Sequence, residues 1–188
     1  ALIGLAVCLA GSSSGVGIDS TESSQQGWGI HYGPTLSMTI LGSQDRRAGA
    51  AFGVQHRQPI PLRMLQFARS ELVFEGYHLF SKGGGIYEFG PDRTFGYGVL
   101  IHGRWLFPSG KDGEAFVEIG WGLQIQDTRT HDLGSRLNST PTVGIGWVGT
   151  SGKVNPKVTL RIMHISSAGF VPRNLGQNQL QLLFGLSF

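Results

Sequence analysis

Alternation between large apolar residues and small or polar residues recurs along this chain, and it constrains the fold more than any other feature. In residues 94–107 the even positions are mostly glycine, threonine, histidine or arginine, with leucine at 100 and 106. The odd positions carry Phe95, Tyr97, Val99, Ile101, Trp105 and Phe107. A period of two over this length predicts a β-strand with one apolar face and one small or polar face.

The same pattern predicts seven further strands. It is clear in Ala115–Gln126, Thr142–Val148, Lys157–Ser166 and Leu180–Phe188, and poorer in Gly27–Ile40, Arg47–Arg57 and Ala68–Phe80. We expect Pro34 and the Pro59/Pro61 pair to mark breaks within or after these earlier strands. An even number of strands can close antiparallel without free edges. The sequence therefore predicts an all-β fold, an eight-stranded antiparallel transmembrane β-barrel over residues 27–188.

Composition favours a barrel in a membrane over one in water. Hydrophobic residues make up 40% of the chain and charged residues only 14%, against roughly 25% charged residues in an average soluble domain. Beyond the extreme N-terminus no apolar run approaches the ~18 residues of a membrane helix. Few charges without long apolar runs is typical of membrane barrels, in which lipid-facing and lumen-facing residues alternate.

The cost of placing charge in lipid assigns the two faces. A lysine or arginine on the lipid side at the bilayer midplane costs roughly 2–4 kcal/mol, so we expect Arg104, Glu118 and Arg161 to point inward. Because so narrow a barrel is filled by side chains, Glu118 should pair there with Arg104 or Arg161. The lipid face should carry Tyr97, Val99, Ile101, Val117, Ile119, Trp121, Ile145, Leu160, Ile162, Leu182 and Phe184.

The N-terminal residues have the pattern of a secretory signal. Residues 1–10 are apolar and end in small residues, so we interpret them as a signal-peptide remnant followed by a polar segment over residues 11–26. Cleavage near Ala10 would remove Cys8, the only cysteine. A lipoprotein signal at Cys8 is disfavoured because Val7 is bulky for the residue before an acylated cysteine. Both termini of the barrel are expected on the periplasmic side.

Two polar residues interrupt an apolar face near the end of one strand. His164 and Ser166 are two apart, so their side chains leave the same face as Ile162. With periplasmic termini, this end of the strand lies near the outer leaflet, at the depth of the ester bonds of lipopolysaccharide. A serine hydroxyl beside an imidazole is the minimal apparatus of acyl transfer.

The segment His164-Ile-Ser166-Ser167-Ala168-Gly169, with Asn174 and Gly176 following, resembles the C-terminal motif of the lipid A 3-O-deacylase family (PagL-type, acyloxyacyl hydrolase). Residues 116–122 and 133–141 are also similar to that family, and the likeness spans roughly Glu114 to Phe188. It implies an eight-stranded barrel in the outer membrane of Gram-negative bacteria. It also implies hydrolysis of the acyl chain ester-linked at position 3 of lipid A without metal or cofactor, with His164 as general base and Ser166 as nucleophile.

Two positions depart from the family pattern. Ser167 replaces an asparagine associated with the oxyanion hole, and Asn178 replaces the glutamate that completes the triad. Parity places Asn178 on the same face as His164, so its amide oxygen is expected to orient the imidazole. The oxyanion hole is expected from the backbone around Ser167, Ala168 and Gly169.

Partners and alternatives follow from the same features. The basic residues are scattered, which argues against nucleic acid binding. His31, His56, His78, His102 and His131 lack the spacing of metal ligands. The expected partners are lipid A or lipopolysaccharide, the outer-membrane bilayer and, because Phe188 ends the last strand, the barrel-assembly machinery. Whether the barrel forms a homodimer stays open, as do two other functions: an inactive relative of the deacylases, and a passive structural or adhesive barrel.

Overall fold

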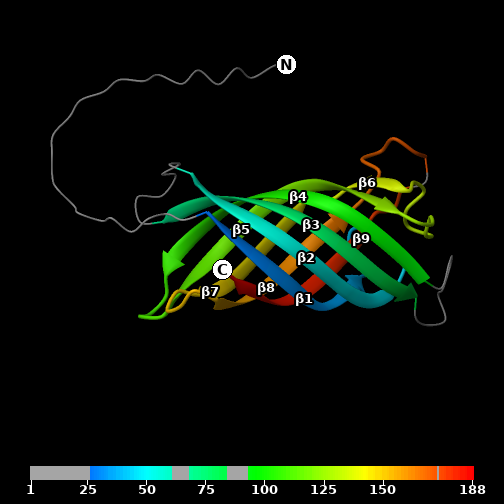
Figure 1. The fold of residues 1–188 in the computed structure, drawn as a ribbon. Coiled ribbons are helices and arrows are strands. Elements are labelled where there is room, and N and C mark those ends of the chain that lie inside the picture. The colour runs from blue at the N-terminus through cyan, green and yellow to red at the C-terminus, as the bar shows by residue number, and fades with distance from the viewer. Residues whose placement is uncertain (1–25, 61–67, 84–92, 173) are drawn as a thin grey trace, which may run out of the picture.

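One antiparallel sheet curls until its first and last strands meet. The structure is a computed structural model that describes residues 26–60, 68–83, 93–172 and 174–188. Its strands are β1 (Gly27–Met38), β2 (Arg47–Ile60), β3 (Arg69–Gly83), β4 (Arg93–Pro108), β5 (Gly113–Gln126), β6 (Leu137–Ser139), β7 (Thr142–Gly149), β8 (Asn155–Ile165) and β9 (Gln177–Ser187). Pairing of β1 with β9 and of β4 with β5 closes the barrel (Figure 1). The predicted eight-stranded barrel is confirmed, with the short β6 as an addition.

Some of the sequence predictions concern residues that are not described. The signal-peptide remnant over residues 1–10 lies outside the described residues, as do Pro61 and all but the last residue of the polar segment 11–26. Within the described ranges, no helix is long and apolar enough to cross a membrane.

The two faces of the barrel wall are those that the alternation predicts. Every residue expected on the lipid face is exposed, from 38% for Val117 and Leu182 to 62% for Tyr97 and Val99. Glu118 and Arg161 are buried in the interior, with exposed fractions of 0% and 1%. A shift of one residue would move every one of these side chains to the other face of the wall. The predicted orientation of these side chains is therefore confirmed.

The interior is held by carboxylates shared between guanidinium groups. Glu118 contacts Arg104 Nη2 through Oε2 at 2.8 Å and Arg161 Nη2 through Oε1 at 3.0 Å, so the predicted pairing is confirmed with both partners. Arg161 also donates from Nη1 and Nη2 to the two oxygens of Glu75, each at 2.8 Å. Two carboxylates therefore face two guanidinium groups, which offsets the cost of burying each charge.

The strand break expected at Pro34 is wrong, because β1 continues through this residue. Only one of the two pairings of β1 is interrupted there. β1 runs through Pro34, which lies opposite Ala50 of β2. The pairing of β1 with β9 omits Gly33 and Pro34 and resumes at Thr35, opposite Gln181. Proline has no N–H to donate, so the ladder loses pairing on one side only. β2 includes Pro59, which lies opposite Glu71, and ends at Ile60, so the break expected at the Pro59/Pro61 pair falls at the end of this strand.

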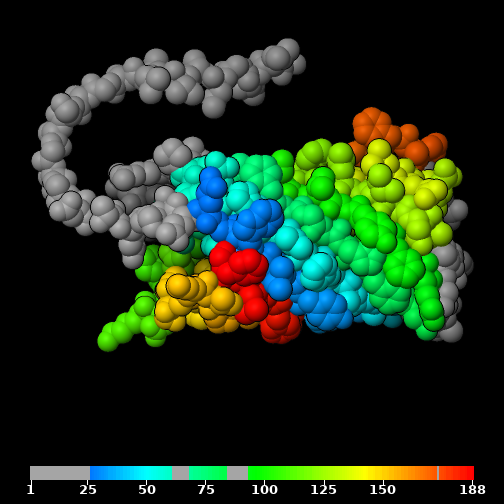
Figure 2. All heavy atoms as spheres, in the orientation of Figure 1, coloured from blue at the N-terminus to red at the C-terminus, as the bar shows by residue number. Residues whose placement is uncertain are grey.

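At one end of the barrel, hereafter the loop end, three described segments gather: residues 39–46, residues 127–136, and residues 166–172 with 174–176. β6 continues the line of β7 along β5 beyond Pro141, since Leu123 faces Ser139 and Gly120 faces Thr142. In Figures 1 and 2 the yellow residues of β6 and the orange loop after β8 lie together at this end. Leu133 is fully buried in the apolar cluster that also holds Met163 and Ile165 of β8, so the loop of β6 is anchored inside the barrel mouth.

Candidate active site

His164 and Asn178 face each other across the last two strands at the loop end. The register of β8 and β9 places them directly opposite. His164 Nδ1 lies 2.8 Å from Asn178 Oδ1. His164 is partly exposed on the outward side, whereas Asn178 is 1% exposed. The two residues that parity placed on one face are therefore in direct contact.

A backbone carbonyl fixes which way the Asn178 amide points. Asn178 Nδ2 donates to the carbonyl oxygen of Ile40 at 2.7 Å. Since a carbonyl can only accept, the amide oxygen must be the atom that faces His164. An oxygen at that position requires a proton on Nδ1, which leaves Nε2 of His164 as the basic nitrogen.

Ser166 is held by β6 rather than by β9. Its N–H donates to Ser139 O at 3.1 Å, and its carbonyl accepts from Ser139 N at 2.7 Å. The side chain of Ser139 donates to the same carbonyl at 3.2 Å. Among the described residues Ser166 Oγ has no hydrogen-bond partner, His164 included. Contacts between nucleophile and base are often long in the absence of substrate.

The residues after Ser166 form a tight turn with two unengaged N–H groups. Ala168 and Gly169 both have positive φ, 52° and 82°, and Phe170 N donates to Ser167 O at 3.0 Å. A left-handed conformation at alanine is strained, and such strain is concentrated at functional sites. Neither Ala168 N–H nor Gly169 N–H meets an acceptor in the described part of the chain. Ser167 N–H is engaged, because it donates to Asn174 Oδ1 at 3.0 Å.

Asn174 and Gly176 each have a local structural role. Asn174 ties the end of its loop to Ser167 and pairs with Leu133 as an isolated bridge. Gly176 has φ +74°, and a Cβ added there would lie 2.6 Å from Cε1 of His164. Only glycine therefore allows both the backbone conformation and the position of the imidazole.

An apolar groove begins beside the turn. It has a volume of about 440 Å³ and is lined by Trp121, Leu123, Ser135, Leu137, Asn138, Ser139, Ser167, Ala168 and Phe170. Two large apolar residues in these loops are mostly exposed: Leu41 is 80% exposed and Phe170 is 90% exposed. Such a surface suits a long apolar ligand chain.

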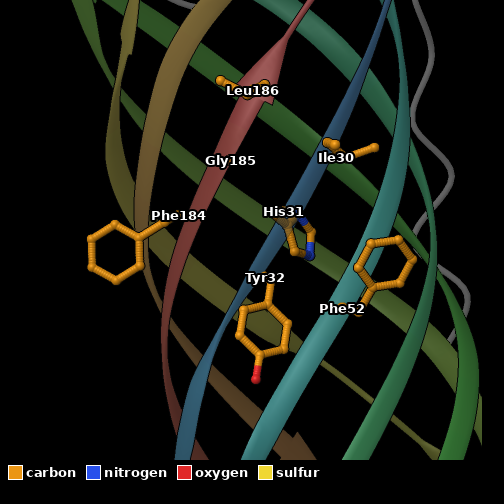
Figure 3. Close-up of a pocket in the computed structure, with 7 residues that line it drawn as sticks. All are labelled: Ile30, His31, Tyr32, Phe52, Phe184, Gly185 and Leu186. Atoms are coloured by element: carbon orange, nitrogen blue, oxygen red, sulfur yellow. The ribbon is translucent and has the colours of Figure 1, made fainter.

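A second outward groove, of about 330 Å³, lies toward the opposite end of β1 and β9. Its lining residues are Ile30, His31, Tyr32, Phe52, Phe184, Gly185 and Leu186 (Figure 3). The only histidine there is buried, with Nε2 directed to Glu75 Oε1 of the interior at 3.4 Å. Its one imidazole faces the interior, and its lining residues include no serine, threonine or cysteine, so we assign this groove no chemistry.

Charged groups around the site belong to the loops. Burial raises the pKa of the Asp45 carboxyl, and the guanidinium of Arg47 opposes that shift from 3.3 Å.

In the described part of the chain, no group of three or more histidine, cysteine, aspartate or glutamate side chains is placed to hold a metal ion.

Comparison with known proteins identifies the family. The model of the lipid A 3-O-deacylase (PagL) family matches residues 74–187, more than half of the chain. The chain belongs to this family. The match to the lipid A 3-O-deacylase family contains every residue of the candidate site from His164 to Asn178, and it begins upstream of the likeness seen in the sequence alone. A search of curated proteins gave no match.

Solved structures support the same fold. The crystal structure of the outer membrane enzyme PagL matches with a TM-score of 0.62 and 16% identity, over 84% of this chain and 97% of that one. Neisserial surface protein A (NspA) matches with a TM-score of 0.60 and 12% identity, over 86% of this chain and 95% of that one. At these identities the likeness concerns the barrel alone.

Three contributors to the site lie outside the residues proposed from the sequence. Ile40 fixes the Asn178 amide, Ser139 holds the backbone of Ser166, and Asp132 joins the loops around both. Ser139 lies in the segment 133–141 whose likeness to the family was visible. Ile40 acts through a backbone carbonyl, which leaves no mark in the sequence.

Proposed function

We propose that this chain is an esterase of the Gram-negative outer membrane that removes the acyl chain ester-linked at position 3 of lipid A. The family and the barrel fold support lipid A as substrate and the outer membrane as location. The observation that carries the proposal is the hydrogen bond that holds the His164 ring, on the outward face and two residues from Ser166. In this proposal the loop end faces the outer leaflet and both ends of the barrel chain face the periplasm.

The reaction proceeds through an acyl-serine. Ser166 Oγ attacks the ester carbonyl while His164 Nε2 takes its proton, and the carbonyl oxygen becomes an oxyanion. When the tetrahedral intermediate collapses, the bond between the carbonyl carbon and the 3-oxygen of lipid A breaks, and His164 gives its proton to that oxygen, which leaves as a hydroxyl. Water then attacks the acyl-serine with His164 as base, releasing the fatty acid and restoring the serine hydroxyl.

The free N–H groups of Ala168 and Gly169 are our candidates for the oxyanion hole. They belong to the turn that follows Ser166, and removal of one such donor costs about 2.7–4 kcal/mol in a serine protease. The Ser167 N–H is left out because Asn174 already accepts from it. The groove that Ala168 helps to line would take the acyl chain.

Asn178 would orient the imidazole without supplying negative charge. The loss of charge in the corresponding Asp→Asn change of a serine protease costs about 10⁴-fold in kcat. A single neutral hydrogen bond is worth about 0.5–1.5 kcal/mol. We therefore expect Asn178→Glu to keep or raise the rate although glutamate cannot donate to Ile40 O. Asn178→Ala should impair hydrolysis less than loss of Ser166 or His164.

The purified chain, folded in detergent and given lipid A, tests the proposal by release of the 3-linked fatty acid. Ser166→Ala and His164→Ala should each lower the rate by about 10³-fold or more, whereas Ser109→Ala, in a turn at the other end of the barrel, should leave it unchanged. Equal rates for wild type and Ser166→Ala would refute the mechanism.

The loss of the acidic triad residue favours a second candidate, an inactive relative of the deacylases. The structural likeness to NspA is compatible with a passive surface barrel, although it is slightly weaker than the likeness to PagL. Release of fatty acid by Asn178→Glu but not by wild type would identify a decayed enzyme. No release by either would favour the passive barrel.

A further inference from the structure

A single buried carboxylate joins the three loops that the structure describes at the loop end. Asp132 is fully buried. Its Oδ2 accepts from Ser43 Oγ at 2.8 Å, Gln44 N at 2.9 Å and Asp45 N at 2.8 Å. A carboxylate that receives several charge-assisted hydrogen bonds is held firmly, and it holds its donors equally. The segment 43–45 is thereby fixed to the loop that precedes β6.

The backbone of the same residue holds the third loop. The carbonyl oxygen of Asp132 accepts from Leu175 N at 3.1 Å and from Gly176 N at 3.2 Å. The neighbouring Leu133 is buried in the barrel mouth and pairs with Asn174. Asp132 is therefore anchored to the barrel interior on one side and to the loop after β8 on the other.

Both loops that Asp132 holds reach His164, the proposed catalytic base, through further contacts. In one direction, Gly176 lies against His164, where even an added Cβ would collide with the ring. In the other, the turn that contains Ser43 closes by a hydrogen bond from Ser43 N to Ile40 O at 3.1 Å. The same Ile40 oxygen receives the Asn178 amide, which in turn contacts His164.

We propose that Asp132 is a positioning residue of the hydrolytic site, setting the ring and the tautomer of His164 through Gly176 on one side and Ile40 and Asn178 on the other. This inference rests on the proposed function for its effect on catalysis. Its structural part, the control of His164, is independent of that function. A carboxylate suits this position because one buried oxygen accepts from three donors, and its charge strengthens each of those hydrogen bonds.

Two measurements on the full chain folded in detergent test this role. The first is the steady-state hydrolysis of lipid A, for which Asp132→Ala should lower kcat by about 10- to 100-fold, as expected when reacting groups are misplaced by ~1 Å. KM should change little, because the groove is lined by other residues. Asp132→Asn, which keeps an acceptor oxygen but no charge, should fall between Asp132→Ala and wild type.

The second measurement is ¹⁵N NMR of the histidine rings, which reports the tautomer of His164 with or without catalysis. Asp132→Ala should lower the fraction of ring protonated at Nδ1. The matched control is Asp127→Ala in the same loop, whose carboxylate accepts from Phe95 N at 2.9 Å and makes no hydrogen bond to a described residue of the site. This control should change neither kcat nor the tautomer.

The outcomes separate this inference from the proposed function. If wild type releases no fatty acid, the proposed function fails, while the tautomer comparison still decides the role of Asp132. An unchanged His164 tautomer and unchanged kcat in Asp132→Ala would overturn the inference. So would a loss confined to KM, or equal losses in Asp132→Ala and Asp127→Ala. If Asp132→Ala does not fold, Asp132→Asn and Ser43→Ala are compared with wild type by the same two measurements.

Discussion

Polar side chains pair with one another in the interior of this barrel and at its loop end, and the two arrangements differ. In the interior, Glu118 lies between Arg104 and Arg161, each contact about as short as a charge-assisted hydrogen bond. At the loop end, His164 and Asn178 form a neutral pair on the outward face, with the ring partly exposed. Glu118, Arg104 and Arg161 satisfy one another, whereas the outer pair leaves Nε2 of His164 without a partner among the described residues.

This difference separates stability from chemistry. Removal of one member of an enclosed set of opposite charges lowers the free energy of unfolding, because it leaves the others buried and unpaired. A neutral pair with one free nitrogen contributes little to stability and presents a base on the outward face. Variants in the interior should therefore change unfolding, and variants at the loop end should change the rate of hydrolysis.

The largest expected effect is on the interior. Glu118→Gln removes the charge shared by Arg104 and Arg161 and should lower the free energy of unfolding by about 3–5 kcal/mol, measured by urea titration of the folded barrel. Glu114→Gln on the same strand is the matched control. Its partner Arg69 is 41% exposed, so the loss should stay below about 1 kcal/mol. Similar losses in the two variants would contradict the interior account.

A smaller effect, on rate alone, is expected at the loop end. Gly176→Ala places a Cβ against the His164 ring and should lower kcat by about tenfold or more. Gly110→Ala, in a turn at the opposite end with a similar φ of +80° and open space around it, carries the same backbone strain and should leave kcat unchanged. Equal activity of the two variants would show that Gly176 does not set the ring.

The smallest effect on stability is expected at the last residue. Phe188 exchanges backbone hydrogen bonds with Trp28 at 2.7 and 2.9 Å, and alanine would keep both. Phe188→Ala should therefore change unfolding by less than about 0.5 kcal/mol. If its side chain is read by the assembly machinery, the heat-modifiable folded form in cells should decrease on gels, but not for Leu186→Ala. An unchanged yield for Phe188→Ala would remove that role.

The wall of the barrel could be predicted from the sequence because its physics is local. Alternation fixes which side each residue faces, and the cost of charge in lipid decides which side is outward, so Glu118 and Arg161 were placed correctly. The strand break expected at Pro34 is wrong because the missing N–H disturbs the pairing of β1 with β9 but not its pairing with β2. β6 is too short for a period of two to be recognised.

The candidate site could be predicted only in part. The period of two along a strand predicts that His164 and Asn178 lie on the same face of the wall, and the structure shows them in contact. The partners that hold them come from distant loops: Ile40 is 138 residues from Asn178 in the sequence, and Asp132 is 89 residues from Ser43. Periodicity carries no information about such contacts, because they arise only when the closed barrel brings its loops to one end.

Mass spectrometry of lipid A from Gram-negative cells that express the chain tests the central claim most directly. Expression of wild type should shift lipid A by the mass of the acyl chain at position 3, and Ser166→Ala, folded in the same membranes to the same level, should leave it intact. Unmodified lipid A in cells with folded wild type, or the same loss with Ser166→Ala, would contradict the account.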